Sequence, residues 1–401
     1  MSERIFITGF GLITAIGNDA EENLQSLQSN RHGYGSIETF ETAHKDSIRA
    51  CEIKLTDLQL AERCGVRLEK GFTRTALLGL AAVREAVQSA GLSDAEVRQT
   101  GLLSATTTGG IREYEKYFKS VQDLTKKGAF EIHTDTANPG EHTERIADHI
   151  GITKYLATVS TACSSSVNTI IQGARLIKNN RLDRVICGGT EALSKFTING
   201  FNSLLILDRE HCRPFDATRK GLNLGEGAAY VVLESERVVS KSGKKILGEV
   251  KGYGNANDAF HQTASSPEGN GAFLAMNMAL ESSGLKPSQI DYINAHGTAT
   301  ENNDISEGLA LQKLFANNVP AFSSTKPFTG HTLAAAGSVE VVFCLMGMQN
   351  GMVFPNLNFK QQMSELSITP VLESRPMNMK YVLSNSFGFG GNTSSIVLGT
   401  P

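Results

Sequence analysis

One cysteine lies in a segment of small residues where it could act as a nucleophile. Cys163 stands in VSTACSSSVNTI (residues 159–170), between a strand-like segment and an apolar-periodic segment that predicts a helix. A thiol at a helix N-terminus is close to free N–H groups and to the positive end of the helix dipole, which lower its pKa toward the thiolate. Buried, inert cysteines are nevertheless common, so the position alone leaves both roles open.

Two histidines occupy similar junctions. His296 lies in NAHGTAT (294–300) at a predicted strand end, and His331 lies in KPFTGH (326–331) before the apolar segment LAAAGSVEVVFCLM. Either could be a capping or core histidine instead of an acid–base or hydrogen-bonding group. Zinc-type paired ligand spacings are lacking, so we expect no metal and no cofactor. Lys326 could be a solvated lysine or a charge near the site.

A glycine-rich segment, NSFGFGG (385–391), lies between two predicted strands. No Lys-Ser/Thr follows it and no helix N-terminus is offered, so it does not fit a phosphate loop. Its glycines would let a backbone N–H approach a substrate oxygen closely.

Strand-like and helical segments alternate along the chain around these residues. Helical periodicity, as at residues 76–87, fills the gaps between short strand-like runs, which predicts an α/β fold with largely buried sheets. The strand-like runs are residues 5–8, 102–106, 184–187, 228–234, 292–295, 321–324, 381–384 and 395–398.

Two segments echo each other: AVQSAGLSDAEV (86–97) and ALESSGLKPSQI (279–290). Each is typical of a helix end at glycine, a polar turn and entry into a strand. We therefore expect two similar halves, residues 1–243 and 244–401, joined near KSGKKI (241–246). The first half is longer, and its extra length is expected in the polar, irregular residues 109–154.

Composition excludes several classes of function. The formal net charge of −3 gives no global attraction to nucleic acid or to an anionic membrane. Six cysteines without a CxxC pair are typical of a reducing, cytoplasmic setting. The longest apolar stretch, residues 333–348, contains Ser338 and Glu340 and is expected to be too short to span a bilayer. The sequence therefore predicts a soluble cytoplasmic protein.

In combination, these motifs resemble those of a known family. TACSSS, NAHGTAT, SSTKPFTGH and NSFGFGG have the order and approximate spacing found in the elongating (type I/II) β-ketoacyl-acyl carrier protein synthases. The resemblance extends over essentially the whole chain, including residues 7–18, 212–234 and 330–340. It implies a thiolase-like fold, with two βαβαβαββ halves in five layers (α-β-α-β-α), assembled as a homodimer.

The resemblance also implies a reaction. Cys163 would take an acyl chain from acyl-acyl carrier protein, and His296 and His331 would hydrogen-bond the malonyl thioester as it loses CO₂. Claisen condensation would then give 3-oxoacyl-acyl carrier protein in fatty acid elongation. The backbone N–H groups of Cys163 and Phe389 would form the oxyanion hole, and the Phe389 ring would gate the acyl pocket.

Supporting roles follow from the same resemblance. Lys326 would pair with Glu307 and hold the histidine geometry, and Asp304 lies on the same helical face as Glu307. Thr298 and Thr300 would hydrogen-bond the phosphopantetheine arm. The carrier protein would dock on a basic rim formed by Lys126, Lys127 and Arg209.

Some positions depart from the family pattern and leave the acyl-chain preference open. Asn392 and Thr393 reverse the usual order in GGNTSS (390–395), residues 105–110 read ATTTGG, and Pro267 follows two serines. A dedicated polyene or polyketide pathway with the same chemistry is one alternative. Another is a non-catalytic chain-length-type subunit, which the retention of the cysteine and both histidines disfavours. The lack of a cysteine after Cys344 argues against a thiolase.

Overall fold

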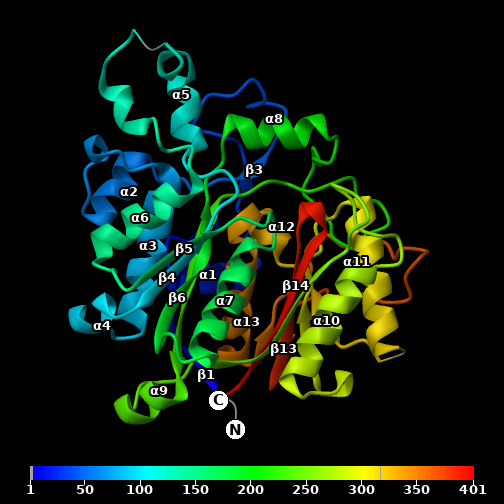
Figure 1. Ribbon diagram of the computed structural model, residues 1–401. Coiled ribbons are helices and arrows are strands. Elements are labelled where there is room, and N and C mark those ends of the chain that lie inside the picture. Colours follow the sequence, from blue (N-terminus) through cyan, green and yellow to red (C-terminus); the bar gives the residue numbers. More distant parts are fainter. Residues whose placement is uncertain (1–2, 124, 317) are drawn as a thin grey trace.

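A ten-stranded sheet forms the centre of the protein (Figure 1). The structure, a computed structural model, describes residues 3–123, 125–316 and 318–401. In spatial order the strands are β10 (Ala321–Ser323), β9 (Tyr292–Asn294), β13 (Tyr381–Phe387), β14 (Asn392–Gly399), β8 (Gly248–Asn257), β1 (Ile5–Thr14), β7 (Gly227–Ser235), β6 (Arg184–Glu191), β4 (Gly101–Ala105) and β5 (Tyr155–Val159).

The strand pairing repeats in the two halves. In the first half β4 is parallel to β5 and β6, and β7 is antiparallel to β6 and β1. In the second half β9 is parallel to β10 and β13, and β14 is antiparallel to β13 and β8. The halves join where β1 meets β8, at the pairs Phe6–Glu249 and Ile7–Gly248. The predicted duplication is confirmed, whereas the boundary at residues 243/244 stays a proposal.

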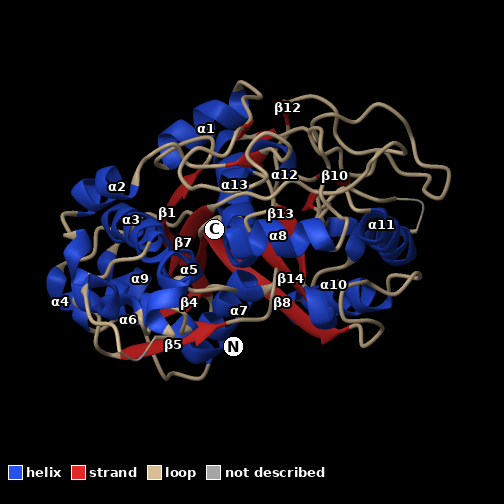
Figure 2. Cartoon of the chain, turned by 90° about the horizontal axis from the view of Figure 1, so that it is seen from above, coloured by secondary structure: helices blue, strands red, loops and turns tan. Residues whose placement is uncertain are grey.

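Helices cover both halves and separate them. On the outer faces α3 (Arg74–Ser89) packs on the first half and α10 (Asn270–Ser283) on the second. Between the halves lie α7 (Ser165–Lys178) and α13 (Ala336–Asn350), which contact strands of both (Figures 1 and 2). This is the expected five-layer arrangement, and it buries the N-termini of α7 and α13 at the centre of the molecule.

Equivalent glycines let the outer helices approach the sheet. A Cβ on Gly11 of β1 would collide with the carbonyl oxygen of Ala82 in α3, and one on Gly254 of β8 with that of Ala275 in α10. The two contacts are alike because β1 and β8 hold the same place in their halves. A glycine thus permits close helix–sheet packing at the equivalent position of each half.

The expectation of an irregular segment at residues 109–154 was wrong. The segment contains α5 (Ile111–Val121), the 3-10 turn η2 (Ala129–His133) and α6 (Pro139–Ile150), and α5 projects at the top of Figure 1. These helices are short and rich in charged residues, so the segment looks irregular, although the apolar residues of α5 (Ile111, Tyr114, Phe118 and Val121) recur at helical spacing. Strand β8 was not predicted either, since its glycines and asparagines have low strand propensity.

The remaining helices and strands connect these layers. They are α1 (Ala20–Gln28), β2 (Tyr34–Gly35), β3 (Ala50–Cys51), α2 (Asp57–Cys64), η1 (Leu68–Lys70), α4 (Asp94–Arg98), α8 (Lys195–Ser203), α9 (Glu236–Ser242), η3 (Pro287–Gln289), α11 (Glu301–Phe315), α12 (Lys326–Thr329), η4 (Leu333–Ala335), β11 (Met352–Val353), β12 (Arg375–Pro376) and η5 (Phe389–Gly391).

The helical stretch Leu333–Asn350 is long and apolar enough to cross a membrane by length and composition, so the expectation that it is too short was wrong. However, 83% of its 18-residue window is buried inside the protein. It packs between the two halves of the sheet, which is the position of a core helix.

Candidate active site

Cys163 lies in a tight turn between β5 and α7. Strand β5 ends at Val159, Ala162 adopts a left-handed φ of 53°, and Ser164 is the N-cap of α7. The turn leaves the Cys163 side chain only 5% exposed. The thiol therefore lies at the N-terminus of a buried helix, as the sequence predicted.

The electrostatic setting of this thiol differs from the prediction. Burial raises the pKa of Cys163 to about 12, although the Lys326 charge and a hydrogen bond from the Phe389 backbone N–H act to lower it. The expected shift toward the thiolate is therefore wrong for the resting protein, because loss of water outweighs these contacts. The sulfur has to lose its proton in the course of the reaction.

The two histidines meet at one cavity although 34 positions of other sequence separate them. His296 follows β9, His331 precedes η4, and their ring centroids lie 5.3 Å apart at 83°. Cys163, His296 and His331 all line a cavity of about 310 Å³. Burial and the nearby Lys326 charge lower the pKa of both imidazoles well below the usual value. Both rings are therefore neutral hydrogen-bond donors and not cations.

Lys326 fixes the tautomer of His296. Its Nζ lies 3.3 Å from His296 Nδ1 and 2.5 Å from the His296 carbonyl oxygen, and it also donates to Glu340 Oε1. An ammonium group can only donate, so Nδ1 must accept. The hydrogen of the neutral ring is then on Nε2.

The predicted Lys326–Glu307 pair is wrong, because Lys326 pairs with Glu340 of α13. Glu307 instead accepts the backbone N–H groups of His296 and Gly297, at 2.9 and 2.8 Å. Burial raises the pKa of both carboxyl groups to about 7. The signal for Glu340 was present in the sequence: it is an isolated acidic residue inside an apolar helix.

Asp304 holds the next part of the same turn. Its carboxylate accepts the N–H of Phe215 at 2.7 Å and that of Ala299 at 3.2 Å. Thr298 and Thr300, on either side of Ala299, have their hydroxyl oxygens 2.9 Å apart and line the 310 Å³ cavity. The helical spacing of the two acids thus directs both carboxylates at the turn that carries His296.

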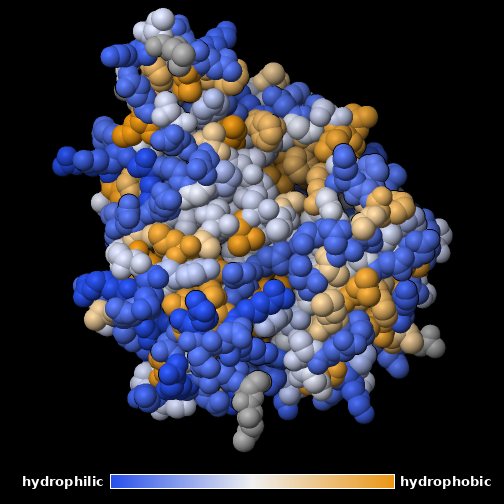
Figure 3. Space-filling view, in the orientation of Figure 1, coloured by the Kyte–Doolittle hydropathy of each residue, from blue (hydrophilic) through white to orange (hydrophobic). Residues whose placement is uncertain are grey.

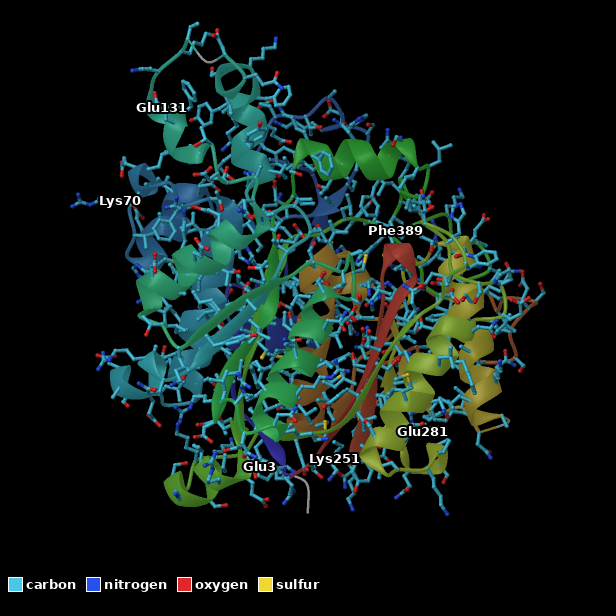
Figure 4. All side chains as sticks on the ribbon, in the orientation of Figure 1. Glu3, Lys70, Glu131, Lys251, Glu281 and Phe389 are labelled. Carbon is cyan, nitrogen blue, oxygen red and sulfur yellow. The ribbon has the colours of Figure 1, made fainter. Side chains whose placement is uncertain are left out.

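Phe389 lies at the tip of the β13–β14 hairpin (Figure 4). Its backbone N–H acts to lower the pKa of the Cys163 thiol, and its ring stacks on Phe201 of α8 with centroids 5.8 Å apart and an interplanar angle of 16°. The glycine-rich loop is thus confirmed as a turn between strands. It brings one N–H and one aromatic ring to the thiol.

Two cavities meet at the thiol. The first is the 310 Å³ cavity with the histidines and threonines, and the second, of about 470 Å³, is mainly apolar. Cys163, Phe201 and Phe389 line both. Apolar surface recessed in the upper part of the molecule is visible in Figure 3. The stacked phenylalanines thus lie where a polar compartment passes into an apolar one.

Glu191, at the end of β6, was not among the site residues predicted from the sequence. This buried carboxylate accepts the hydroxyl groups of Thr106, Thr107 and Thr108 at 2.6–3.1 Å, and the backbone N–H of Ala334 at 3.3 Å. Thr107 and Thr108 line the apolar cavity, so the unusual ATTTGG run forms part of its wall. Within residues 3–123, 125–316 and 318–401, no group of three or more His, Cys, Asp or Glu could hold a metal ion.

Comparison with known families identifies the chain. The model for the beta-ketoacyl synthase N-terminal domain matches residues 2–238, and the model for the C-terminal domain matches residues 247–360. The chain belongs to the β-ketoacyl synthase family. The expectation of an acyltransferase that condenses acyl chains is confirmed at this level.

Individual relatives agree over the full length. The 3-oxoacyl-acyl-carrier-protein synthase 2 of Synechocystis sp. is 33% identical over 98% of this chain and 97% of its own. The protein of the same name from Staphylococcus aureus is 30% identical over 99% and 98%. Among solved structures, the ishigamide ketosynthase/chain length factor superposes with a TM-score of 0.91 at 28% identity, covering all of both chains. The ketosynthase ApeO with its chain length factor ApeC from Xenorhabdus doucetiae gives a TM-score of 0.84 at 30% identity, covering 100% and 98%.

Proposed function

We propose that the chain transfers an acyl group from acyl-acyl carrier protein to Cys163 and condenses it with malonyl-acyl carrier protein. The observation that carries the proposal is the shared cavity, in which Cys163 faces two neutral histidines and the Nε2–H tautomer of His296 is fixed by Lys326. A thiol and aligned N–H donors are what acyl transfer followed by enolate formation requires.

In the first step the Cys163 sulfur bonds to the acyl carbonyl carbon. The carrier's thioester bond breaks, and the leaving phosphopantetheine sulfur takes a proton in place of the one that Cys163 gives up. The N–H groups of Phe389 and Cys163 stabilise the oxyanion that forms between these events.

In the second step the malonyl C–CO₂ bond breaks and its electron pair enters the enolate. The Nε2–H groups of His296 and His331 donate to the thioester oxygen, which carries the new charge. The enolate carbon then attacks the acyl carbon, the bond to Cys163 breaks, and the sulfur takes up a proton. The products are CO₂ and 3-oxoacyl-acyl carrier protein.

The two cavities fit the two parts of such a substrate. We assign the phosphopantetheine arm to the 310 Å³ cavity, where Thr298 and Thr300 present hydroxyl groups, and the acyl chain to the 470 Å³ cavity. Phe389 lies between them and would have to turn aside when a chain enters. Lys326, Glu307 and Asp304 act as positioning residues.

The partner in this reaction is an acidic carrier protein. Arg209, Lys126 and Lys127 are exposed, and Arg209 donates to the Ser47 carbonyl oxygen and to Asn202 Oδ1. If reversing the three charges left the Michaelis constant for the carrier protein unchanged at low salt, the proposed rim would be wrong.

We further propose that the enzyme is a cytoplasmic dimer. Strand β5 forms one edge of the sheet with each of its residues at least partly exposed, so a second chain could extend the sheet there. The expected result is a dimer mass by light scattering at micromolar concentration, and a monomer would contradict it.

A second candidate keeps the chemistry but places it in polyketide synthesis. It is favoured by the ketosynthase/chain length factor structures, one of which superposes at a TM-score of 0.91. In that case the partner at β5 would be a paralogous chain. A panel of acyl-acyl carrier proteins of different length and unsaturation, assayed with and without such a partner, separates the two pathways.

The proposed function is tested by measuring acyl transfer and CO₂ release separately in variants of the cysteine and of the histidines. Cys163→Ala should abolish acyl transfer to the protein, whereas slow CO₂ release from malonyl-acyl carrier protein survives. His296→Ala and His331→Ala should each lower CO₂ release by about 10²-fold, the cost of losing one oxyanion donor. Condensation by Cys163→Ala, or wild-type decarboxylation by both histidine variants, would refute the proposal.

A further inference from the structure

The Asn392 side chain collects three hydrogen bonds at the base of the Phe389 loop. Its Oδ1 accepts from Ser164 Oγ at 2.6 Å, from Asn168 Nδ2 at 2.8 Å and from Asn255 Nδ2 at 3.0 Å. Ser164 follows Cys163 directly, Asn168 is in the first turn of α7, and Asn255 is in β8. One oxygen therefore ties together the nucleophile turn and strands of the second half.

The same residue closes the Phe389 loop. The Gly388 N–H donates to the Asn392 carbonyl oxygen at 2.8 Å, so the four residues from 388 to 391 form a turn that ends on Asn392. The backbone of this turn lies directly on the nucleophile turn, because a Cβ on Gly388 would lie 2.8 Å from the Thr161 carbonyl oxygen and 3.2 Å from the Cys163 nitrogen. The loop and the cysteine are thus joined through the main chain and side chain of Asn392.

We infer that Asn392 is a positioning residue that holds the Phe389 N–H against the Cys163 sulfur. The inference rests on the proposed function, since it assumes that this N–H serves acyl transfer. Asn392 is one of the residues at which this chain departs from the family pattern, and its amide oxygen is the acceptor that the donors of Ser164, Asn168 and Asn255 share. The histidine donors stand on other elements, after β9 and before η4, so they do not depend on this contact.

The inference predicts a split between the two half-reactions. Asn392→Ala should lower the rate of acyl transfer to Cys163 by about tenfold to 10²-fold, the effect of a small misplacement of an oxyanion donor. Decarboxylation of malonyl-acyl carrier protein without an acyl donor should stay within about twofold of wild type, because it uses the histidine N–H groups. A residue that only stabilised the fold would affect both reactions together.

Asn257→Ala is the matched control. Asn257 also touches the loop, through a bond from its Nδ2 to the Gly390 carbonyl at 3.3 Å, and its Oδ1 accepts from Ala259 N–H. No bond joins its side chain to the nucleophile turn among the described residues. Both half-reactions should therefore stay within about twofold of wild type in this variant.

The experiment measures radiolabelled acyl transfer, CO₂ release and thermal unfolding for wild type, Asn392→Ala, Asn257→Ala and Ser164→Ala. A double variant, Asn392→Ala with Ser164→Ala, should be no slower in acyl transfer than the slower single variant, because each change alone already breaks the bond between Ser164 and Asn392. Equal losses in the two half-reactions of Asn392→Ala, unchanged acyl transfer, or additive losses in the double variant would overturn the inference. Failure of the proposed function would look different, since wild type itself would then transfer no acyl group.

Discussion

Replacing Lys326 by Met tests whether this residue orients His296 or only neutralises Glu340. The ammonium lies between the two groups, and its side chain and that of Glu340 are each 3% exposed. Removing one partner of such a buried pair costs about 3–5 kcal/mol of stability. Part of this cost is relieved if Glu340 takes up a proton, and burial has already raised its pKa to about 7.

The sign of the pH dependence follows from this pKa. The Lys326 charge lowers the pKa of Glu340, so the variant raises it further above the unfolded value. A raised folded pKa means that the folded protein binds the extra proton, and stability is lost as the pH rises through that pKa. The deficit of Lys326→Met in urea unfolding should therefore grow between pH 6 and pH 8. Lys313→Met, which removes an exposed lysine of α11, should change stability by less than about 0.5 kcal/mol.

Decarboxylation separates the two roles. Lys326→Met should lower CO₂ release from malonyl-acyl carrier protein by about 10²-fold, because His296 Nδ1 loses the donor that keeps the hydrogen on Nε2. The double variant with Glu340→Leu replaces the ion pair by apolar groups and should regain most of the stability. It should not regain decarboxylation. If the double variant released CO₂ at the wild-type rate, the tautomer argument would be refuted.

Three further predictions follow from single contacts. Gly388→Ala should slow acylation of Cys163 by about tenfold or more, because its Cβ would meet a main-chain carbonyl 2.8 Å away; an unchanged burst of acyl-enzyme would count against this. Glu191→Gln should cost about 2 kcal/mol in urea unfolding, since several donors share its carboxylate, and stability equal to wild type would contradict the contacts. Burial lowers the pKa of His142 to about 4, so the unfolded chain binds a proton that the folded protein does not between about pH 6.5 and 4. As the pH falls through that window, the stability advantage of wild type over His142→Gln should shrink by up to about 3 kcal/mol. An advantage independent of pH would refute the lowered pKa of His142.

The sequence predicted the duplicated fold because the repeated helix ends can be recognised in short stretches of sequence. The echo at residues 86–97 and 279–290 marks equivalent helix ends: Gly91 and Gly284 both adopt left-handed φ, at 59° and 70°, before β4 and β9. Of the short helices at residues 109–154, α6 does carry such a marker: Pro139 is its first residue, and it ends at Gly151, which also has a left-handed φ, of 87°. It could have been predicted from these ends, whereas no glycine or proline marks the C-terminus of α5. The stability of both helices comes from packing against the rest of the chain, which a periodicity argument does not contain.

The sequence predicted those site residues that local sequence marks. It did not predict contacts between side chains that lie far apart in the chain. Cys163, His296, His331 and Phe389 each stand at a strand or helix end, and the structure brings them together around one thiol. Lys326 was matched with the wrong acid, because which carboxylate it meets depends on how α13 lies against α12. The predicted direction of the shift in the Cys163 pKa was wrong for a similar reason, because the desolvation that raises this pKa depends on how the whole core packs around the thiol.

In the proposed mechanism, the groups that serve the two half-reactions are supported by different elements. The Phe389 N–H reaches Cys163 from the β13–β14 hairpin, whereas His296 is held by Glu307 of α11 and Lys326 of α12, and the His331 backbone N–H donates to the Asn223 carbonyl oxygen. Each set of donors is therefore anchored by its own buried polar contacts. Because acyl transfer and decarboxylation place negative charge on different oxygens, separate anchors let each set be aligned without disturbing the other. If the 470 Å³ cavity holds the acyl chain as proposed, variation at Thr107 and Thr108 would alter which chain is accepted while the proposed decarboxylating donors keep their geometry.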